Sequence, residues 1–390
     1  MNIYNKIGTV KNKNILLFQG CMGKYFDKLD KEFQSKGANT FRLGLNGGDA
    51  FFSSFNNFFS FRDKKELFFN FAINKFKELS IDMIFIFGDC RYYQERAIEA
   101  AKQLDIKIFV FEEGYLRPNF ITLEKTGVNA NSLIPRKREF YDKVVIKDDL
   151  IINETGNTFF KMAYESSIYY LVSFLKRKEF PNYQHHRSFN PIKEGFFGFI
   201  SFIRKFKYKL LESNKENEFK EELSKKYFFV PLQTFGDFQI VKHSKYNKVE
   251  DFIFEVLTSF SSNSSKEHKL VFKHHPVDRG RKDYSSFINK IAKKLGCLDR
   301  IIIVFDVHLP TILKNAIGTI VVNSTVGLSS IYHSTPTICL GDCIYDIEGL
   351  TSQEDLKYFF SKPSKVDSEL FDKYRYWLIK NTQLNSNFYL

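Results

Sequence analysis

Two adjacent glutamates, Glu112 and Glu113, end an apolar run and directly precede Gly114. The run, residues 106–111, is rich in β-branched and aromatic residues, which is typical of a buried strand. Ligands of open α/β sheets bind beyond the carboxyl ends of the strands. Either glutamate could act there as a general acid or base, and the glycine allows the backbone to turn close to a substrate. The alternative is a surface turn with two solvated carboxylates.

Imidazole, amine, hydroxyl and carboxylate groups follow three apolar runs in the second half of the chain. Histidine can donate to a phosphate or act as an acid, and hydroxyl groups at a helix start can bind an anion. Solvated histidines and an ordinary helix cap are the alternatives. These residues are Gln233 and Asp237 after the first run, Lys273, His274, His275 and Pro276 after the second, and Asn323, Ser324 and Thr325 after the third.

Strands that alternate with helices must position these groups. Apolar runs at residues 14–18, 40–45, 83–87 and 106–111 are each followed by a polar, glycine-containing loop, with helical patterns between them. This alternation predicts a parallel, doubly wound sheet whose loops meet at one edge. The same alternation starts again at residue 227. We therefore expect an α/β protein with two Rossmann-type domains that face each other across a cleft.

The composition predicts where these domains begin and end. Residues 1–212 are expected to form the first domain, although residues 121–152 and 181–191 have the character of loops. Residues 213–226 are rich in Glu, Lys and Asn and are expected to be a linker. Residues 227–350 then form the second domain. Helices over residues 351–390 can pack back on the first domain.

The net charge of +13 favours anionic partners such as phosphorylated substrates, anionic lipid or nucleic acid. No motif that reads RNA or DNA is present, so we expect no nucleic-acid partner. The five cysteines are few and scattered, which is typical of reduced thiols and not of a zinc site. Neither a signal peptide nor a membrane span is apparent, so a cytoplasmic protein is expected.

One segment combines aromatic residues with cations. Residues 196–210 contain Arg204, Lys205, Lys207 and Lys209, no acidic residue and five phenylalanines. Such a helix can lie in a membrane interface and be held there by anionic lipid. The alternative is a helix that packs on the core while its lysines are solvated.

Short motifs in a fixed order between about residues 14 and 340 resemble capsule polysaccharide biosynthesis proteins of the KpsS/LipB type. The intervening segments, including residues 196–226, depart from that pattern. The motifs are Leu17-Phe18-Gln19-Gly20, Asn46-Gly47-Gly48-Asp49, Glu112-Glu113-Gly114-Tyr115-Leu116-Arg117-Pro118, residues 121–129, Pro231-Leu232-Gln233 with Asp237, His243 and Ser244, His275-Pro276, and Asn323-Ser324.

The resemblance implies a GT-B glycosyltransferase that takes Kdo from CMP-Kdo and retains the β configuration. Its acceptor side would be the first domain and its CMP-sugar side the second. The implied acceptor is phosphatidylglycerol or its lyso form, on which the enzyme starts the Kdo linker of a capsular polysaccharide. We expect no cofactor and no metal ion, because the chain has neither a Walker-type loop nor a suitably placed Asp-x-Asp pair. The implied partners also include a capsule biosynthesis and export complex and the anionic face of the inner membrane, with which the protein associates peripherally.

The resemblance also implies roles for individual residues. Asp237 is the expected nucleophile, and Glu113 is the expected general base, with Glu112 as the second candidate. A retaining double displacement needs both a nucleophile and a base. The donor is expected at Lys273, His274, His275, Pro276, Asn323, Ser324, Thr325 and Gln233, and the sugar and acceptor at Gln19, Gly20, Asn46, Asp49 and Arg117.

Two other functions remain open from the sequence. In an inverting sialyl- or Kdo-transferase, Glu113 would act as the base and Asp237 would be structural. A non-catalytic component of capsule assembly or export would keep the fold only to bind a glycolipid. The roles of Glu113 and Asp237 can also be exchanged.

Overall fold

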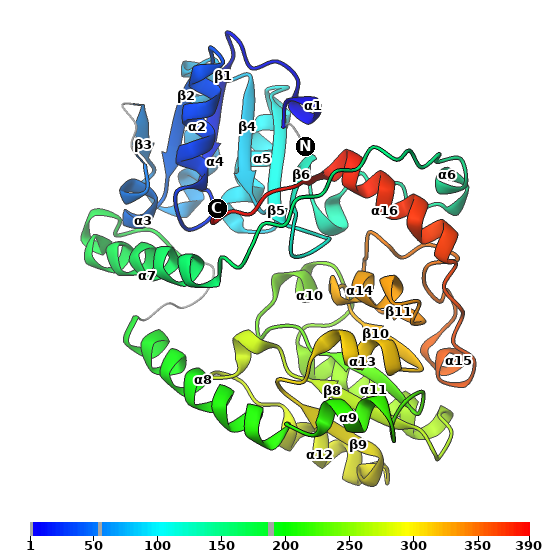
Figure 1. Ribbon diagram of the computed structural model, residues 1–390. Coiled ribbons are helices and arrows are strands. Elements are labelled where there is room, and N and C mark those ends of the chain that lie inside the picture. The colour runs from blue at the N-terminus through cyan, green and yellow to red at the C-terminus, as the bar shows by residue number, and fades with distance from the viewer. Residues whose placement is uncertain (1–2, 54–56, 186–190) are drawn as a thin grey trace. The chain divides into compact units, whose positions relative to one another are not determined.

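The computed structural model describes residues 3–53, 57–185 and 191–390, and its chain divides into two α/β units (Figure 1). Residues 186–190, part of the loop expected over residues 181–191, lie outside the described residues. Unit 1 consists of Met1–Leu133, Lys147–Pro191 and Leu378–Leu390, and unit 2 of Ile134–Ile146 and Ile192–Trp377. The expected boundary at residues 213–226 is therefore not where the structure divides the chain.

The sheet of unit 1 has the strand order β3-β2-β1-β4-β5-β6-β12. Its parallel part, β3 to β5, has the 3-2-1-4-5 order of a Rossmann fold, so the loops after β1, β2, β4 and β5 lie at one edge, as predicted. The strands are β1 (Asn14–Phe18), β2 (Asn39–Gly44), β3 (Phe58–Ser60), β4 (Met83–Phe87), β5 (Lys107–Glu113), β6 (Ile121–Lys125) and β12 (Gln383–Leu384).

The predicted parallel pairing is confirmed for β1 to β5, but the prediction of a loop from residue 121 is wrong. The β6 strand pairs antiparallel with β5, and β12 pairs antiparallel with β6. Ile121 and Leu123 alternate with Thr122 and point their side chains into the core of the unit. This five-residue alternation is a strand signal, but the polar turn residues around it obscured the pattern.

Helices cover both faces of this sheet. Along β1, Ile15 and Leu17 pack with α2 on one face, while Leu16 and Phe18 pack with α4 and α5 on the other. This alternation of buried faces is what a doubly wound sheet requires. The helices of unit 1 are α1 (Tyr4–Ile7), α2 (Tyr25–Ser35), α3 (Gly47–Phe51), α4 (Phe68–Glu78), α5 (Tyr92–Gln103) and α7 (Phe159–Leu175).

The sheet of unit 2 is parallel and has the order β11-β10-β7-β8-β9, which is again the Rossmann order. Its strands are β7 (Tyr227–Pro231), β8 (Lys269–Lys273), β9 (Ile301–Val304), β10 (Gly318–Val321) and β11 (Thr337–Cys339). Its helices are α6 (Arg138–Asp142), α8 (Pro191–Leu211), α9 (Lys215–Lys220), α10 (Phe238–Lys242), α11 (Val249–Asn263), α12 (Ser285–Lys294), α13 (Leu309–Asn315), α14 (Val326–Tyr332) and α15 (Leu356–Ser361), and α16 (Ser368–Thr382) continues into unit 1.

The segment expected to be a linker contains α9, a helix of unit 2. Phe219 of α9 is fully buried against Tyr227 and the residues of α13, so the helix belongs to the core. A single apolar residue among many polar ones does not stand out in the sequence. The two Rossmann-type units confirm the predicted fold class. No helix in the described part of the chain combines the length and the apolar character that crossing a membrane requires.

Candidate functional site

A cavity of about 340 Å³ lies at the edge of the unit 1 sheet where the parallel strands end. Of the residues predicted for a site, Gln19, Gly20, Glu112 and Glu113 line it. Its other walls are largely aromatic, and the sequence analysis did not identify them. They are formed by Tyr92, Tyr93, Tyr169, Tyr170, Tyr183 and Tyr389, together with Arg91 and His185.

The floor of the cavity is the point where the strand order of unit 1 reverses, between β1 and β4. Gln19 follows β1 with a positive φ of 32°, and its Oε1 accepts a hydrogen bond from Nε2 of Gln94 on α5 at 2.9 Å. Its Nε2 donates to the hydroxyl of Tyr183 at 3.3 Å. Open α/β sheets bind their ligands at such switch points.

The carboxyl group of Glu112 has an environment suited to proton transfer. Its Oε1 accepts a hydrogen bond of 2.9 Å from the backbone N–H of Glu113. Burial raises the pKa of Glu112 to about 7, and the neighbouring Arg91 only partly opposes this rise. A carboxyl group that titrates near neutral pH can both take up and release a proton under physiological conditions.

The turn after the glutamates needs glycine at position 114. A Cβ there would lie 1.9 Å from the carbonyl oxygen of Phe120, so any side chain would push the β5–β6 turn apart. Nε of Arg117, an exposed residue, donates to the carbonyl of Gly114 at 3.2 Å. Behind the turn, the hydroxyl of Tyr115 donates to Glu124 at 2.7 Å. The turn that follows Glu112 and Glu113 is therefore held from both sides.

Asn46 and Asp49, expected to contact the sugar, are buried and do not line the cavity. Asn46 caps α3 by accepting from the N–H of Asp49 at 3.0 Å, and its Nδ2 donates to the hydroxyl of Tyr169 on α7. That hydroxyl donates in turn to Oδ1 of Asp49 at 2.8 Å. Burial raises the pKa of Asp49. This network positions Tyr169 in the wall of the cavity.

A carboxylate of the protein itself occupies the amino end of α2. A Cβ on Gly23, whose φ is 140°, would overlap Oε2 of Glu165 on α7, which also accepts from the N–H of Lys24 at 3.3 Å. In dinucleotide-binding Rossmann folds, this end of the first helix receives a phosphate. Glu165 therefore lies where a phosphate lies in those folds.

The structure brings together the groups predicted in unit 2. The strands β8, β7 and β10 are neighbours and parallel, so the residues that follow them share one edge. The order reverses between β7 and β10, and there Nε2 of Gln233 donates to Oδ1 of Asn323 at 2.9 Å. The same Nε2 also lies 3.2 Å from Oδ2 of Asp237. A glutamine after the first strand thus bridges the switch point in both units.

Asp237 is half-buried and caps α10. Its Oδ1 accepts from the N–H of Gln239 at 3.0 Å, while its Oδ2 faces Gln233. Gly236, with a φ of 69°, allows the backbone to enter this cap. In the same loop, Asp278 accepts from the N–H of Phe235 at 2.7 Å. The loop therefore presents one carboxylate at the sheet edge and is anchored by another.

The three polar residues at the end of β8 differ in their surroundings. Lys273 is buried, donates to the carbonyl of Phe305 at 2.6 Å, and has its pKa lowered by burial to about 8. Burial also lowers the pKa of His274, which stacks on Phe305 and accepts from the N–H of Tyr284 at 2.9 Å. His275 is half-buried, and its Nδ1 accepts from the N–H of Val277. Because Nδ1 accepts, the proton of a neutral ring is on Nε2.

The segment after β10 is fixed by a tyrosine. Oγ of Ser324 accepts from the N–H of Val326 at 3.2 Å, and its carbonyl accepts from the hydroxyl of Tyr345. A Cβ on Gly327 would lie 2.2 Å from that hydroxyl, so Tyr345 packs directly over the glycine. Ser324 and Thr325 are both half-buried at the start of α14. They share the sheet edge with Asp237 and Lys273.

The end of α8 is fastened to the same edge. The carboxylate of Glu212 accepts from the backbone N–H groups of Phe305 and Asp306, at 2.8 and 2.7 Å. The ring of Tyr208 stacks on Phe305 with centroids 4.0 Å apart, and the other face of Phe305 meets His274 at 4.4 Å. Phe305 therefore links α8 to the loop after β8.

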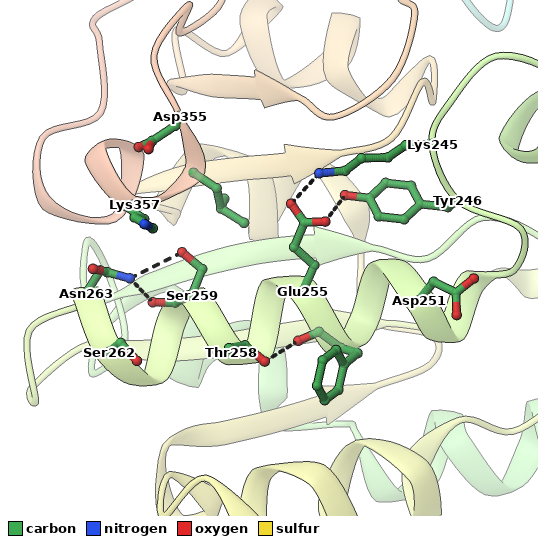
Figure 2. A pocket seen from close by; sticks show the side chains of 12 residues that line it. Lys245, Tyr246, Asp251, Glu255, Thr258, Ser259, Ser262, Asn263, Asp355 and Lys357 are labelled. Carbon is green, nitrogen blue, oxygen red and sulfur yellow. Dashed lines mark hydrogen bonds and ion pairs between the residues drawn. The ribbon is translucent and has the colours of Figure 1, made fainter.

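A larger hollow of about 810 Å³ lies in unit 2 between α11 and α15 (Figure 2). Figure 2 shows Glu255 pointing at both Lys245 and Tyr246, which bind its two oxygens at 2.7 and 3.1 Å. Asp355 caps α15 there by accepting from the N–H of Tyr358. None of the residues predicted for a site lines this hollow.

The predicted residues thus form two sets, one in each unit. Unit 1 gathers Gln19, Gly20, Glu112 and Glu113 around its cavity, with Arg117 beyond the turn and Asn46 and Asp49 behind the wall. Unit 2 gathers its donor-side residues and Asp237 at one sheet edge, apart from the buried ring of His274. Pro276 begins the short 3-10 turn η4 (Pro276–Asp278), which His275 caps.

Comparison with known proteins identifies the family. Residues 82–389 match the family described as "Capsule polysaccharide biosynthesis protein". The chain is 37% identical over 380 residues to the capsule polysaccharide export protein KpsS of Escherichia coli, covering 97% of this chain and 98% of that protein. It is 34% identical to the capsule polysaccharide modification protein LipB of Neisseria meningitidis, over 97% of this chain and 92% of that protein.

Among solved structures, the β-Kdo 2,7 transferase KpsC from Thermosulfurimonas dismutans is 15% identical at a TM-score of 0.44, covering 93% of this chain and 89% of that one. The two curated relatives and the match to residues 82–389, and not this structural likeness, assign the family. The chain therefore belongs to the family of capsule polysaccharide biosynthesis proteins.

Proposed function

We propose that this protein is a glycosyltransferase that moves Kdo from CMP-Kdo to a phosphatidylglycerol-type lipid and retains the β configuration of the donor. The observation that carries the proposal is the sheet edge of unit 2, where the carboxylate of Asp237 lies at the switch point beside Gln233 and Asn323. Lys273, His275 and Ser324 follow the neighbouring strands of the same edge. One nucleophilic group beside several phosphate-binding groups suits a nucleotide-activated sugar.

In the proposed reaction, Asp237 attacks the anomeric carbon of Kdo and the bond to the CMP phosphate breaks. Lys273 and Nε2 of His275 compensate the charge on the departing phosphate, and the hydroxyl groups of Ser324 and Thr325 bind it. The acceptor hydroxyl then displaces Asp237 after a glutamate has taken its proton. Two displacements at one carbon restore the starting configuration.

The general base of this reaction is assigned to Glu113, with Glu112 as the second candidate. Both side chains line the cavity of unit 1. Glu112 titrates near pH 7, which suits an acid/base role, but its Oε1 is held by the N–H of Glu113. The guanidinium group of Arg117 is the proposed partner of the Kdo carboxylate.

The proposal includes the setting of the reaction. A lipid acceptor places the protein at the anionic surface of the inner membrane, as a peripheral partner of a capsule assembly and export complex. The names of the two curated relatives refer to capsule polysaccharide export and modification, which agrees with this setting. No metal ion and no cofactor takes part in the proposed transfer.

The decisive experiment uses the full chain with CMP-Kdo and a fluorescent phosphatidylglycerol. Mass spectrometry should show one Kdo added, and NMR should show a β linkage. Asp237→Asn should abolish transfer, because the amide can still cap α10 but is not a nucleophile. Asp355→Asn is the matched control, since Asp355 caps α15 in the same way at a distance from the sheet edge.

Three results would contradict the proposal. An α-linked product would indicate an inverting enzyme in which Asp237 is structural. Full transfer by Asp237→Asn would remove the nucleophile. Glycolipid binding without transfer or hydrolysis of CMP-Kdo would indicate a non-catalytic component of capsule assembly.

A further inference from the structure

The helix α8 has one face that packs on unit 2. On this face, the backbone of Phe197 approaches Gly280 so closely that a Cβ on the glycine would lie 2.1 Å from the carbonyl oxygen. Arg204 donates to the carbonyl of Arg279 at 2.8 Å, and Tyr208 is buried. Arg204 therefore belongs to the packed face, although the sequence placed it among the cations of a lipid-binding surface.

The opposite face of α8 is apolar and exposed. Phe199, Phe202, Ile203, Phe206 and Leu210 stand at positions i, i+3, i+4, i+7 and i+11, so they lie on one side of the helix. Between 51% and 78% of each is exposed to solvent. An exposed helix face normally carries polar residues, so five large apolar side chains on one face indicate a surface that contacts another molecule.

Lysines border this apolar face. Lys205 and Lys209 lie along one of its edges and Lys207 along the other, as their spacing from Phe206 and Leu210 on a helix of 3.6 residues per turn requires. All three are exposed. Residues 195–211 contain no Asp or Glu, and Glu194 is held on the packed side by Arg281. The face is therefore apolar along its centre and positive at both edges.

We propose that this face of α8 docks on an anionic phospholipid bilayer, with the helix lying in the interface. Apolar side chains then enter the headgroup region, and lysines at both edges meet lipid phosphates. A protein partner would need an apolar surface with acidic residues aligned to both rows of lysines. An anionic bilayer offers acyl chains beneath negative headgroups at every point of its surface. At 21 residues, α8 is roughly 30 Å long, enough for an extended contact.

The inference does not rest on the proposed transfer chemistry, and its test is designed accordingly. The full chain is sedimented with vesicles of phosphatidylserine and phosphatidylcholine, which contain anionic lipid but not the proposed acceptor. We expect binding to these vesicles and none to phosphatidylcholine alone. Because one lysine near an anionic surface contributes about fivefold, the triple variant Lys205→Gln/Lys207→Gln/Lys209→Gln should bind roughly 100-fold more weakly.

Matched variants distinguish binding through this face of α8 from binding that depends only on the net charge of the protein. The triple variant Lys290→Gln/Lys293→Gln/Lys294→Gln removes the same charge from α12 in the same unit and should bind within a few-fold of the wild type. Equal loss in both triple variants would mean that only the net charge matters, which would overturn the inference.

A second pair tests the apolar contribution. Phe202→Ser/Phe206→Ser should abolish co-sedimentation, whereas Phe254→Ser, which removes a phenylalanine of similar exposure on α11, should not. Unchanged binding of the double variant would refute docking through α8. If sedimentation velocity instead shows a wild-type dimer that this double variant loses, the face is a contact between two copies of the chain and the inference is wrong.

Discussion

Replacing Glu112 by glutamine should stabilise the protein at alkaline pH. Burial raises the pKa of this carboxyl group from its ordinary value of 4.5 to about 7. The folded state therefore disfavours the ionised form, and this cost is absent below pH 4.5 and complete above pH 7. A pKa step of one corresponds to 1.36 kcal/mol, so the cost is about 3 kcal/mol at pH 8 and about 1 kcal/mol at pH 5.

Glutamine has nearly the same shape, and its amide oxygen can still accept from the N–H of Glu113. The variant Glu112→Gln should therefore be more stable than the wild type by up to these amounts. In a Rossmann unit of this size, 1 kcal/mol shifts the Tm by about 2–4 °C. We expect a rise of roughly 6–12 °C at pH 8 and of roughly 2–4 °C at pH 5.

Differential scanning calorimetry of the full chain at both pH values measures this effect. Glu78→Gln, at an exposed carboxylate of α4 that pairs with Lys75, should change the Tm little at either pH. A Tm that falls, or a Tm shift that is equal at pH 5 and pH 8, would refute the conclusion that burial raises the pKa of Glu112. A rise in Tm together with lost transfer would indicate that the protein keeps a destabilising carboxylate for its chemistry.

Three further outcomes are expected. Gly114→Ala should unfold the β5–β6 turn and abolish transfer, because the alanine Cβ would overlap the carbonyl of Phe120. Gly198→Ala should be tolerated, because the space around Gly198 is open. Equal melting curves of the two variants by circular dichroism would contradict this prediction. CMP affinity, measured by calorimetric titration, should fall as the pH rises through about 8, where Lys273 loses its charge; a flat profile between pH 7 and 9 would exclude Lys273 from the phosphate site. Glu165→Ala should cost about 1 kcal/mol in denaturant unfolding, as the loss of a helix cap does, and an unchanged midpoint would show that the carboxylate does not stabilise α2.

The sequence predicted much of the scaffold, because strand ends carry a local signal. Apolar runs followed by polar residues marked β1, β2, β4, β5, β7, β8 and β10. The common sheet edges of Glu112 in unit 1 and of Asp237 in unit 2 follow from parallel order alone. These parts of the candidate site were predictable because each depends on residues that are neighbours in the chain.

The missed parts depend on contacts between residues far apart in the chain. Tyr169 reaches the cavity only because α7 is tied to Asn46 and Asp49, more than 100 positions earlier. Glu165 occupies the amino end of α2, and nothing near it in the sequence indicates that role. Arg204 shows the opposite failure, since charge alone placed it on the lipid side, whereas a backbone carbonyl of the loop after β8 holds it inward.

The contacts that Tyr208 and Glu212 make with Phe305 and Asp306 join α8 rigidly to the sheet edge of unit 2. Two hydrogen bonds from backbone N–H groups to the Glu212 carboxylate, and the stacking of Tyr208 on Phe305, restrict the rotation of this end of the helix. Once the outer face of α8 lies on a bilayer, unit 2 can diffuse in the plane of the membrane and rotate about the membrane normal, while these contacts keep the sheet edge of unit 2 in a fixed orientation relative to α8. Docking through α8 therefore sets the height of this sheet edge relative to the lipid headgroups.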